Sequence, residues 1–298
     1  MIKKFSERRI IKATLFLFII FLFYLFPNSN DNNNVNFVSA ISNYHDIYLL
    51  DKNNYVSKTT ISVSSIEKEK LAYDLLTSLI IDSENKNKIP NSFKQVIPKK
   101  TKINSVKINN SLLSVSFSND IKKIGKNKDR MIECIVYTLT SINNIKNIEL
   151  LIEEKNDSFF NKNYYSRSIG INKKYEVSSL DDLKEVTIYY VSKLNDNSYY
   201  IPVTKTINSK DDKIKIIIDE LSSKSTYESD LISYLRNDVI LTNYNIDKDE
   251  VNLYFNESIL SNNDDNKILE EVKYSISYSI NDTIEVSNIH FFIGDKEF

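Results

Sequence analysis

The order of apolar and polar positions repeats once along the chain, most clearly in two stretches that read as hairpins. Residues 103–120, INSVKINNSLLSVSFSND, correspond without a gap to residues 241–258, LTNYNIDKDEVNLYFNES. In each stretch an apolar run meets a polar turn and then a strictly alternating strand. The apolar positions of the two alternating strands correspond one to one: Leu113, Val115 and Phe117 in the first, and Val251, Leu253 and Phe255 in the second. Alternation at a period of two predicts a hairpin with one buried face in each copy.

The elements around the first hairpin are predicted by the same kind of pattern. Residues 47–50 and 56–63 read as strands. Ser64 and Glu67 form a capping-box pattern that opens a helix, whose apolar stripe is spaced for one buried face and which should end near Asp82. After the hairpin, apolar residues at helical spacing from Ile132 to Ile142 predict a second helix, and residues 148–152 a last strand.

The second copy repeats this order. Its strands are predicted at 186–191 and 200–206, and Ser209 with Asp212 should cap the next helix. A further helix carries Ile268, Leu269, Val272 and Ile276, with Tyr274 at the place of Tyr137, and residues 289–293 form the final strand. The prediction is an α+β fold of two tandem β-β-α-β-β-α-β units, each a small sheet packed on two helices.

The N-terminus predicts attachment to a membrane. Five basic residues among the first twelve precede an uncharged run, 13–26, that is rich in Leu, Ile and Phe and ends at Pro27. The basic flank predicts a cytoplasmic N-terminus and export of everything that follows. The run is shorter than the roughly 20 residues of an untilted span, so a signal peptide remains an alternative. We favour an uncleaved single-pass anchor, because the small residues Val38 to Ala40 lie far beyond the apolar run.

These features divide the chain into five parts. Residues 1–27 are the basic flank and anchor, 28–45 an Asn-rich tether, 46–155 the first repeat, 156–185 a connector and 186–298 the second repeat. The connector carries Phe159, Phe160, Tyr164 and Tyr165, which a solvated linker would not need. We expect it to pack against one repeat, with an exposed partner-binding strip as the alternative.

Composition excludes some classes of protein and leaves others open. The chain has 298 residues, 41% of them hydrophobic, which suffices for two modest cores. A net charge of -1 argues against a nucleic-acid binder that works by neutralising phosphates. Because Cys134 is the only cysteine, no disulfide can form within the chain, and we expect its thiol to be buried.

Candidate chemistry is sparse. His45, placed at the end of the tether, and His290, in the last strand, are the only histidines, and we predict no metal site. The three glycines are isolated, so no phosphate-binding loop is present. Acidic pairs occur at four places, and two of the pairs open helices, where capping and the helix dipole favour Asp, so we read the pairs as structural: Glu153 and Glu154, Asp181 and Asp182, Asp211 and Asp212, and Asp264 and Asp265. The acidic run from Asp247 to Glu250 reads as a hairpin turn. We therefore predict no catalytic, cofactor-binding or metal-binding residue.

The ordered set of motifs resembles a known family, the tandem GerMN domains of sporulation and spore germination proteins. The resemblance is carried by DIYLLDKNNY, VTIYYVSKLNDNSYYIPVT, VIPKKTKI, SLLSVSFSND, EVNLYFNES, CIVYTLTSI and VKYSISYSI, and covers about residues 46–155 and 186–296. It implies a compact domain similar to the ring-building motif, without known catalysis. It also implies a membrane-tethered protein that acts between the two spore membranes and supports the complex joining mother cell and forespore.

The hypothesis is thus a non-enzymatic, membrane-anchored assembly protein whose domains lie outside the cytoplasm. Its partners would be envelope proteins of a sporulation complex, with self-association possible. Two other classes stay open at this point. One is a wall-modifying enzyme, and the other is a module that binds peptidoglycan, in which the many tyrosines would line a sugar groove.

Overall fold

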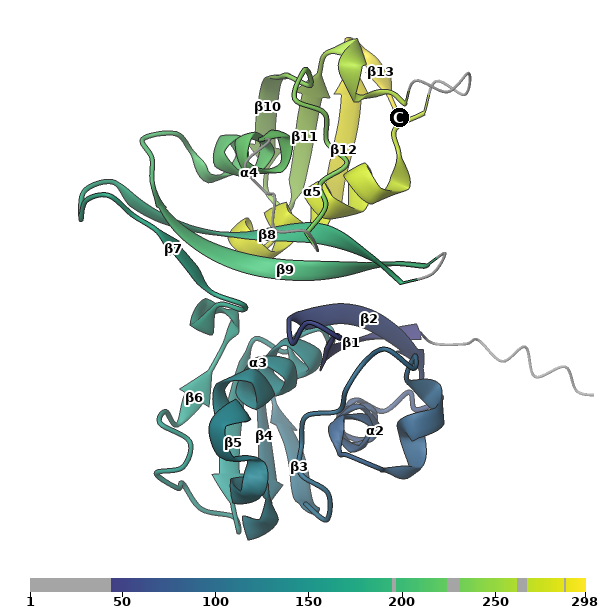
Figure 1. The fold of residues 1–298 in the computed structure, drawn as a ribbon, viewed down its shortest axis with the longest axis vertical. Coiled ribbons are helices and arrows are strands. Elements are labelled where there is room, and N and C mark those ends of the chain that lie inside the picture. The colour runs from purple at the N-terminus through teal and green to yellow at the C-terminus, as the bar shows by residue number, and fades with distance from the viewer. Residues whose placement is uncertain (1–43, 195–196, 224–230, 262–266, 287) are drawn as a thin grey trace, which may run out of the picture. The chain divides into compact units, whose positions relative to one another are not determined.

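The computed structural model describes residues 44–298 apart from 195–196, 224–230, 262–266 and 287 (Figure 1). The expected anchor and nearly all of the tether lie outside the described residues, as does the acidic pair Asp264 and Asp265. Among the helices that are described, none has the length and apolar character needed to cross a membrane.

The predicted element order is found in both repeats. The first consists of strands β1 (Tyr44–Leu50) and β2 (Val56–Ser62), helix α2 (Lys68–Leu79), strands β3 (Ile103–Asn109) and β4 (Leu112–Phe117), helix α3 (Lys128–Leu139) and strand β5 (Asn147–Ile152). The second consists of β8 (Leu183–Leu194), β9 (Asn197–Asn208), α4 (Lys213–Ser222), β10 (Leu241–Asp247), β11 (Glu250–Phe255), α5 (Glu270–Ile284) and β12 (Asn288–Ile293). An α+β fold of two tandem units is thereby confirmed.

Each repeat has its own four-stranded sheet, built around the predicted hairpin. In the first, β3 pairs antiparallel with β4, β4 parallel with β5, and β5 with the short strand β6 (Tyr164–Tyr165). In the second, β10, β11, β12 and the short β13 (Lys296–Glu297) are arranged alike. The predicted inward positions are buried in two separate cores, Leu113, Val115 and Phe117 in the first and Val251, Leu253 and Phe255 in the second.

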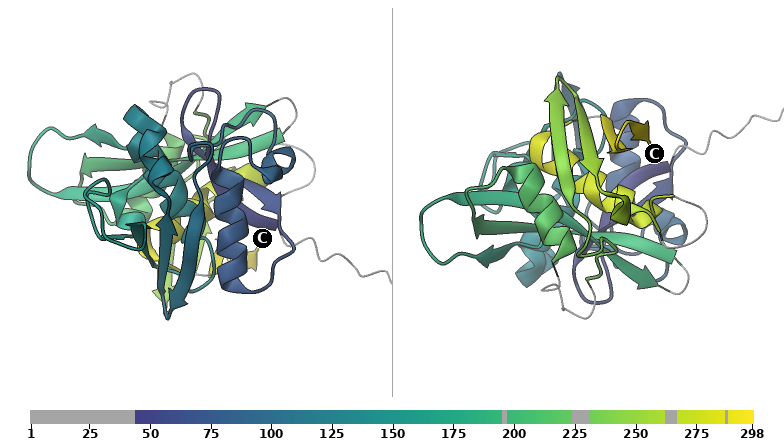
Figure 2. Two further views of the ribbon diagram at one scale, coloured as in Figure 1. Left: turned by 90° about the horizontal axis from the view of Figure 1, so that it is seen from below. Right: turned by 90° about the horizontal axis from the view of Figure 1, so that it is seen from above.

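The opening hairpins differ from the expectation of one small sheet per repeat, because they belong to a third sheet that both repeats share. Strands β1, β2, β9 and β7 are paired in this order, and β8, which lies off this path, also pairs with β9. The hairpins join where Lys58 of β2 pairs with Tyr200 of β9, and they face each other at the middle of the molecule in Figure 1, while Figure 2 shows the same repeats from below and from above. An isolated two-stranded hairpin is marginal in water, so fusion gives each hairpin a neighbour.

Helices cover the outer edges of this shared sheet in equivalent ways. The backbone N–H of Tyr48 in β1 donates to Thr138 Oγ1 of α3 at 2.9 Å. The N–H of Tyr189 in β8 donates to Ser279 Oγ of α5 at the same distance, and each pair is separated by 90 residues. These hydroxyl groups satisfy strand donors that would otherwise lack partners.

The connector packs against the first repeat. Phe160, Tyr165 and Ile171 lie in the first core, whereas Tyr164 is 56% exposed. Strand β7 (Lys174–Glu176) then pairs with β9 of the second repeat. Asn172, which adopts a positive φ, joins the two hairpins because its amide bonds Val56 of β2 and the carbonyl of Pro202 in β9.

Several local predictions need correction at the first helix. The Ser64 and Glu67 capping box is absent, because α2 begins at Lys68 with Glu67 as its N-cap and no side-chain cap. Residues 63–66 lie outside both strand and helix, and in this segment Val63 enters the core and Ser65 donates to Asp74 at 2.5 Å. The helix also ends at Leu79, since Ile80 leaves it to form a bridge with Ile97. In the second repeat, Asp212 does cap α4, accepting from the N–H of Lys215 at 3.1 Å.

Two placements were wrong as well. His45 belongs to β1, opposite Ile61, rather than to the tether. Tyr278, not Tyr274, stands at the place of Tyr137: each precedes the hydroxyl residue that bonds the strand, Ser279 or Thr138. Tyr274 lies one turn earlier and is 45% exposed. Apolar spacing could not distinguish the two tyrosines, because both lie near one helix face.

Candidate functional site

The two repeats meet through equivalent residues. Tyr48 and Tyr189, which are 141 positions apart, place their hydroxyl oxygens 3.0 Å from each other. Both side chains are fully buried. A contact in which the same residue from each copy meets its counterpart is the mark of an approximate two-fold relation. The junction is therefore a specific internal interface.

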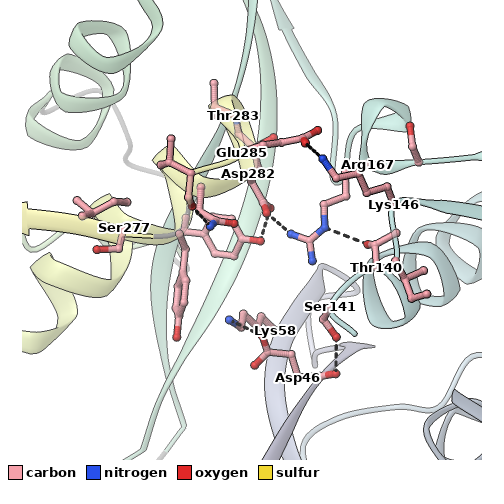
Figure 3. A pocket seen from close by; sticks show the side chains of 18 of the residues that line it. Asp46, Lys58, Thr140, Ser141, Lys146, Arg167, Ser277, Asp282, Thr283 and Glu285 are labelled. Atoms are coloured by element: carbon pink, nitrogen blue, oxygen red, sulfur yellow. Dashed lines mark hydrogen bonds and ion pairs between the residues drawn. The ribbon is translucent and has the colours of Figure 1, made fainter. Parts of the chain in front are cut away.

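A buried ion pair breaks the symmetry of this junction. The guanidinium of Arg167, from the connector, pairs with Asp282 of α5 and also donates to Thr140 Oγ1 at 3.0 Å (Figure 3). Tyr189 donates its hydroxyl hydrogen to the other oxygen of Asp282. The Asp282 side chain is 4% exposed and that of Arg167 26%. Such a pair offsets its desolvation only while all partners are present.

Aromatic rings hold the cations in place. The Arg167 guanidinium lies 4.9 Å from the ring centre of Tyr137. At the equivalent tyrosine of the second repeat, Lys58 Nζ lies 3.5 Å from the ring centre of Tyr278 and 2.8 Å from the carboxylate of Asp46. The equivalent tyrosines Tyr137 and Tyr278 thus each face a cation, but the cations come from the connector and from β2.

Apart from Tyr137, these side chains line a cleft of about 1090 Å³ between the repeats. Its wall carries acidic side chains (Asp46, Glu185, Asp249, Asp282, Glu285) and cationic ones (Lys58, Lys146, Arg167, Lys213) in similar number, together with many hydroxyl and amide groups. Lys146 and Glu285 form an exposed ion pair, with 2.7 Å between Nζ and Oε2, that links the repeats at the rim (Figure 3). The cleft therefore offers balanced hydrogen bonding and no concentrated charge.

Burial keeps the tyrosines of the cleft neutral. Desolvation raises the pKa of Tyr48 and of Tyr189, and for Tyr189 the Asp282 carboxylate raises it further. Desolvation, with Asp46 adding to it, raises the pKa of Tyr278 to about 12. Burial alone would lower the pKa of Arg167, but Asp282 and the surrounding tyrosines raise it well above its usual value. At neutral pH these groups act as hydrogen-bond donors and fixed charge, not as proton shuttles.

Of the residues considered from the sequence, Asp249 and His290 line the cleft, whereas Cys134 and His45 do not. Cys134 is buried in the first core, and burial raises the pKa of its thiol. His290 lies in β12 at the rim of the cleft, and His45 has a buried Nε2 without a hydrogen-bond partner. Within residues 44–298, leaving out the four undescribed gaps, no cluster of three or more His, Cys, Asp or Glu side chains is placed to hold a metal ion.

The acidic pairs that the structure describes stabilise turns and a helix start. Glu154 accepts from Ser105 Oγ at 2.8 Å in a turn where Glu153 and Glu154 have positive φ. Asp211 pairs with Lys215 and Asp212 caps α4. The backbone carbonyl of Asp182, a residue also at positive φ, accepts from the N–H of Ser209 at 3.0 Å. The acidic run from Asp247 to Glu250 is the expected hairpin turn.

Arg167, Asp282 and Asn172 are the important residues that sequence reasoning missed. Arg167 stands in the polar connector, and Asp282 in the last turns of a helix without a charged partner nearby in sequence. One signal was available: Asp282 lies on α5 three positions after Ser279, at the helical spacing of the buried face.

Comparisons with known proteins agree on one relationship. The family model described as "Germane: Sporulation and spore germination" matches residues 46–158 and 187–297. The spore germination protein GerM of Bacillus subtilis (strain 168) is 29% identical over 265 residues, which are 84% of this chain and 71% of that protein. The solved structure of the tandem GerMN domains of the sporulation protein GerM from Bacillus subtilis superposes with a TM-score of 0.74 at 28% identity, over 85% of this chain and 91% of that one.

Proposed function

Because the chain belongs to the Germane family of sporulation and spore germination proteins, we propose that it is a non-enzymatic assembly protein, anchored in the membrane by its N-terminal segment, with both repeats outside the cytoplasm. It stabilises an envelope complex between mother cell and forespore, and its partners are other envelope proteins. The basic flank and apolar run at residues 1–27 motivate the anchor and its orientation.

The observation that carries this proposal is the fusion of the two repeats into one unit. A shared sheet, the contact between Tyr48 and Tyr189, and the buried pair of Arg167 and Asp282 all hold the repeats together. The relative orientation of two binding surfaces matters to a scaffold, because a rigid spacing lets both engage without a further loss of entropy. The hydrogen-bonding and fixed-charge character of the cleft agrees with a role that does not depend on catalysis.

A fluorescent fusion of the full chain in sporulating and vegetative cells tests the proposal. We expect signal at the engulfing septum and recovery of sporulation membrane proteins when the fusion is purified from membranes. The Asp282→Ser variant should reduce that recovery, while Lys146→Ala, at the exposed ion pair, serves as the matched control. Uniform signal around the envelope with no protein recovered would reject the assembly role.

A further inference from the structure

The last part of the connector carries a group of exposed apolar side chains. Strand β7 and the turn after it lead into β8, and this end of the shared sheet projects beyond both repeats (Figures 1 and 2). Tyr175, Val177, Leu180 and Leu183 are all exposed, and we call them the apolar tip. Leu180 is 88% exposed, more than any other large hydrophobic side chain that the structure describes. Apolar side chains gathered on a projecting segment are typical of an interaction surface.

The sheet register places two members of the apolar tip on one face. Tyr175 pairs with Thr206, which pairs in turn with Glu185, and Leu183 pairs with Asn208. Neighbours across a sheet share a face, and so do residues two apart along a strand. Tyr175 and Leu183 therefore lie on the same side of the projecting sheet, and the turn between them carries the other two members of the tip.

Asn208 fixes the backbone of this turn. Its Oδ1 accepts from the N–H groups of Ser178 and Ser179 at 2.7 and 3.3 Å. Its Nδ2 donates to the carbonyls of Ser179 and Asp181 at 3.0 and 2.5 Å. These bonds hold the chain on both sides of Leu180. A partner that binds here meets a turn that is already ordered, so the entropy lost on binding is smaller.

Carboxylates border the apolar tip. Asp181, Asp182 and Glu185 are exposed, and none of them forms an ion pair within the described part of the chain. Lys184 pairs with Ile207, which places it on the opposite face from its neighbours Leu183 and Glu185, and its Nζ donates to two backbone carbonyls just before α4. The exposed surface of the tip is thus apolar and acidic.

This combination specifies the chemistry of the partner. Apolar side chains gain from contact with another apolar surface that loses water with them, and exposed carboxylates gain from Lys or Arg opposite them. Anionic lipids and nucleic acids repel carboxylates. A small molecule favours a concave site, whereas the tip projects from the molecule. The surface of another protein meets both requirements.

We propose that the apolar tip docks into an apolar groove, bordered by Lys and Arg side chains, on another protein of the envelope complex. This inference rests on the assembly role proposed above and states the chemistry of the partner. Leu180 enters the groove, Tyr175 and Leu183 cover its wall, and Asp181 and Asp182 pair with its basic border. A few side chains that fill pockets of the partner carry most of the binding energy of protein interfaces.

Photo-cross-linking from position 180 of the full chain, in sporulating cells, tests the proposal. The variant carries benzoylphenylalanine in place of Leu180. We expect an adduct with an envelope protein, and its cross-linked peptide should be apolar and flanked by Lys or Arg. Ile66, in the first repeat, is the matched control because its side chain is 87% exposed. The same cross-linker at position 66 should give no adduct with that protein.

Substitutions in and around the tip should change the yield of this adduct. Asp181→Lys/Asp182→Lys should lower the yield at least about tenfold by placing like charges in contact. Reversing the charges of the partner's cross-linked segment to Glu should restore it. Tyr175→Ser should lower the yield by removing apolar contact. Asn208→Ala should lower it too, because the turn then has to be ordered on binding.

The outcomes separate this proposal from the assembly role. Absence of a protein adduct at position 180 would overturn the docking surface, as would an adduct with lipid, with a second copy of this chain, or one that charge reversal leaves unchanged. A fusion that lies at the septum and recovers membrane proteins, but gives no adduct, would reject the docking surface alone. An adduct of the expected chemistry at a uniform envelope location would retain the docking surface and reject the sporulation role.

Discussion

The two sheets of this protein place different chemistry at corresponding positions. On the outer face of the first sheet, Ser105 donates to the carboxylate of Glu154 and Ser114 to that of Glu149. Ser116 accepts from the backbone N–H of Glu154, in the Glu153–Glu154 turn. On the second, Tyr254 and Phe292 stack at half exposure beside asparagines without partners in the described structure. The inner faces, by contrast, are alike and apolar. The inner-face positions, which the two repeats share, thus specify the fold. The outer-face positions, which differ, are not needed for the fold and can serve a different function in each repeat.

The junction between the repeats likewise combines positions that the two repeats share with positions at which they differ. Tyr48 and Tyr189 correspond, as do Thr138 and Ser279, and these residues attach each helix to its strand. Asp282 has Ser141 as its counterpart, whose hydroxyl donates to the carbonyls of Asp46 and Thr138. A nearly symmetric contact has therefore acquired an asymmetric ion pair, and changing that pair is the strongest way to test what it contributes.

Replacing Asp282 by Ser, the residue at the corresponding place in the first repeat, should have the largest effect. Arg167 would remain in the junction without its carboxylate, and Tyr189 would lose its acceptor. We expect a loss of about 3–5 kcal/mol in the free energy of unfolding, measured by urea denaturation of the full chain in detergent. Lys146→Ala, which removes an exposed ion pair between the same repeats, should leave the midpoint unchanged. If both variants lowered the free energy of unfolding equally, the burial of the pair between Arg167 and Asp282 would not account for its contribution to stability.

Replacing Asn172 by Ala should have the next largest effect, because this connector residue bonds buried backbone groups of both hairpins. Its side chain bonds the N–H and carbonyl of Val56 and the carbonyl of Pro202, all buried. In the variant these buried backbone groups lose their hydrogen-bond partner, and Ala tolerates the positive φ of this position less well than Asn. We expect the free energy of unfolding, measured by the same urea denaturation, to fall by about 2–4 kcal/mol. Asn208→Ala, whose amide bonds an exposed loop, is the control and should cost less. A ranking in the opposite order would show that the connector does not hold the hairpins together.

Raising the pH should have the smallest of these effects, and it should distinguish the equivalent tyrosines Tyr137 and Tyr278. Burial raises the pKa of Tyr278 to about 12 and that of Tyr137 further, above a usual value of 10. The folded protein then holds protons that the unfolded chain releases, so stability is complete below about pH 10 and falls as the pH rises toward 12. The chain has 19 tyrosines, so the absorbance of Tyr278→Phe is subtracted from that of the wild type, and this difference should show the Tyr278 phenolate forming near pH 12. An unchanged titration in that variant would contradict the assignment.

The apolar pattern was sufficient to predict the tandem organisation, because each repeat buries a hairpin and two helices whose periods are visible in the sequence. The connector also follows from its composition: Phe160 and Tyr165 are too apolar for a solvated linker, and both lie in the first core. Position-specific details were less predictable. Ser64 matched a capping motif, but Val63 beside it is buried in the core and the helix starts only at Lys68.

The junction could not be predicted from the sequence, because its partners are distant along the chain. Arg167 and Asp282 are separated by 115 residues, and neither stands in a local motif. The shared sheet was missed for the same reason, since β2 and β9 are paired through Lys58 and Tyr200 and no pattern within either repeat records that contact. Only the repeat itself offered a hint, since equivalent edge strands need equivalent protection.

Equilibrium unfolding of the full chain followed by hydrogen exchange tests most directly whether the two repeats form one unit. Peptides from β4 in the first core and from β11 in the second report each repeat separately. We predict that both lose protection at the same urea concentration in the wild type, and that Asp282→Ser separates the two transitions. Two well-separated transitions in the wild type would contradict the claim that the shared sheet and the buried ion pair bind the repeats into a single cooperative structure.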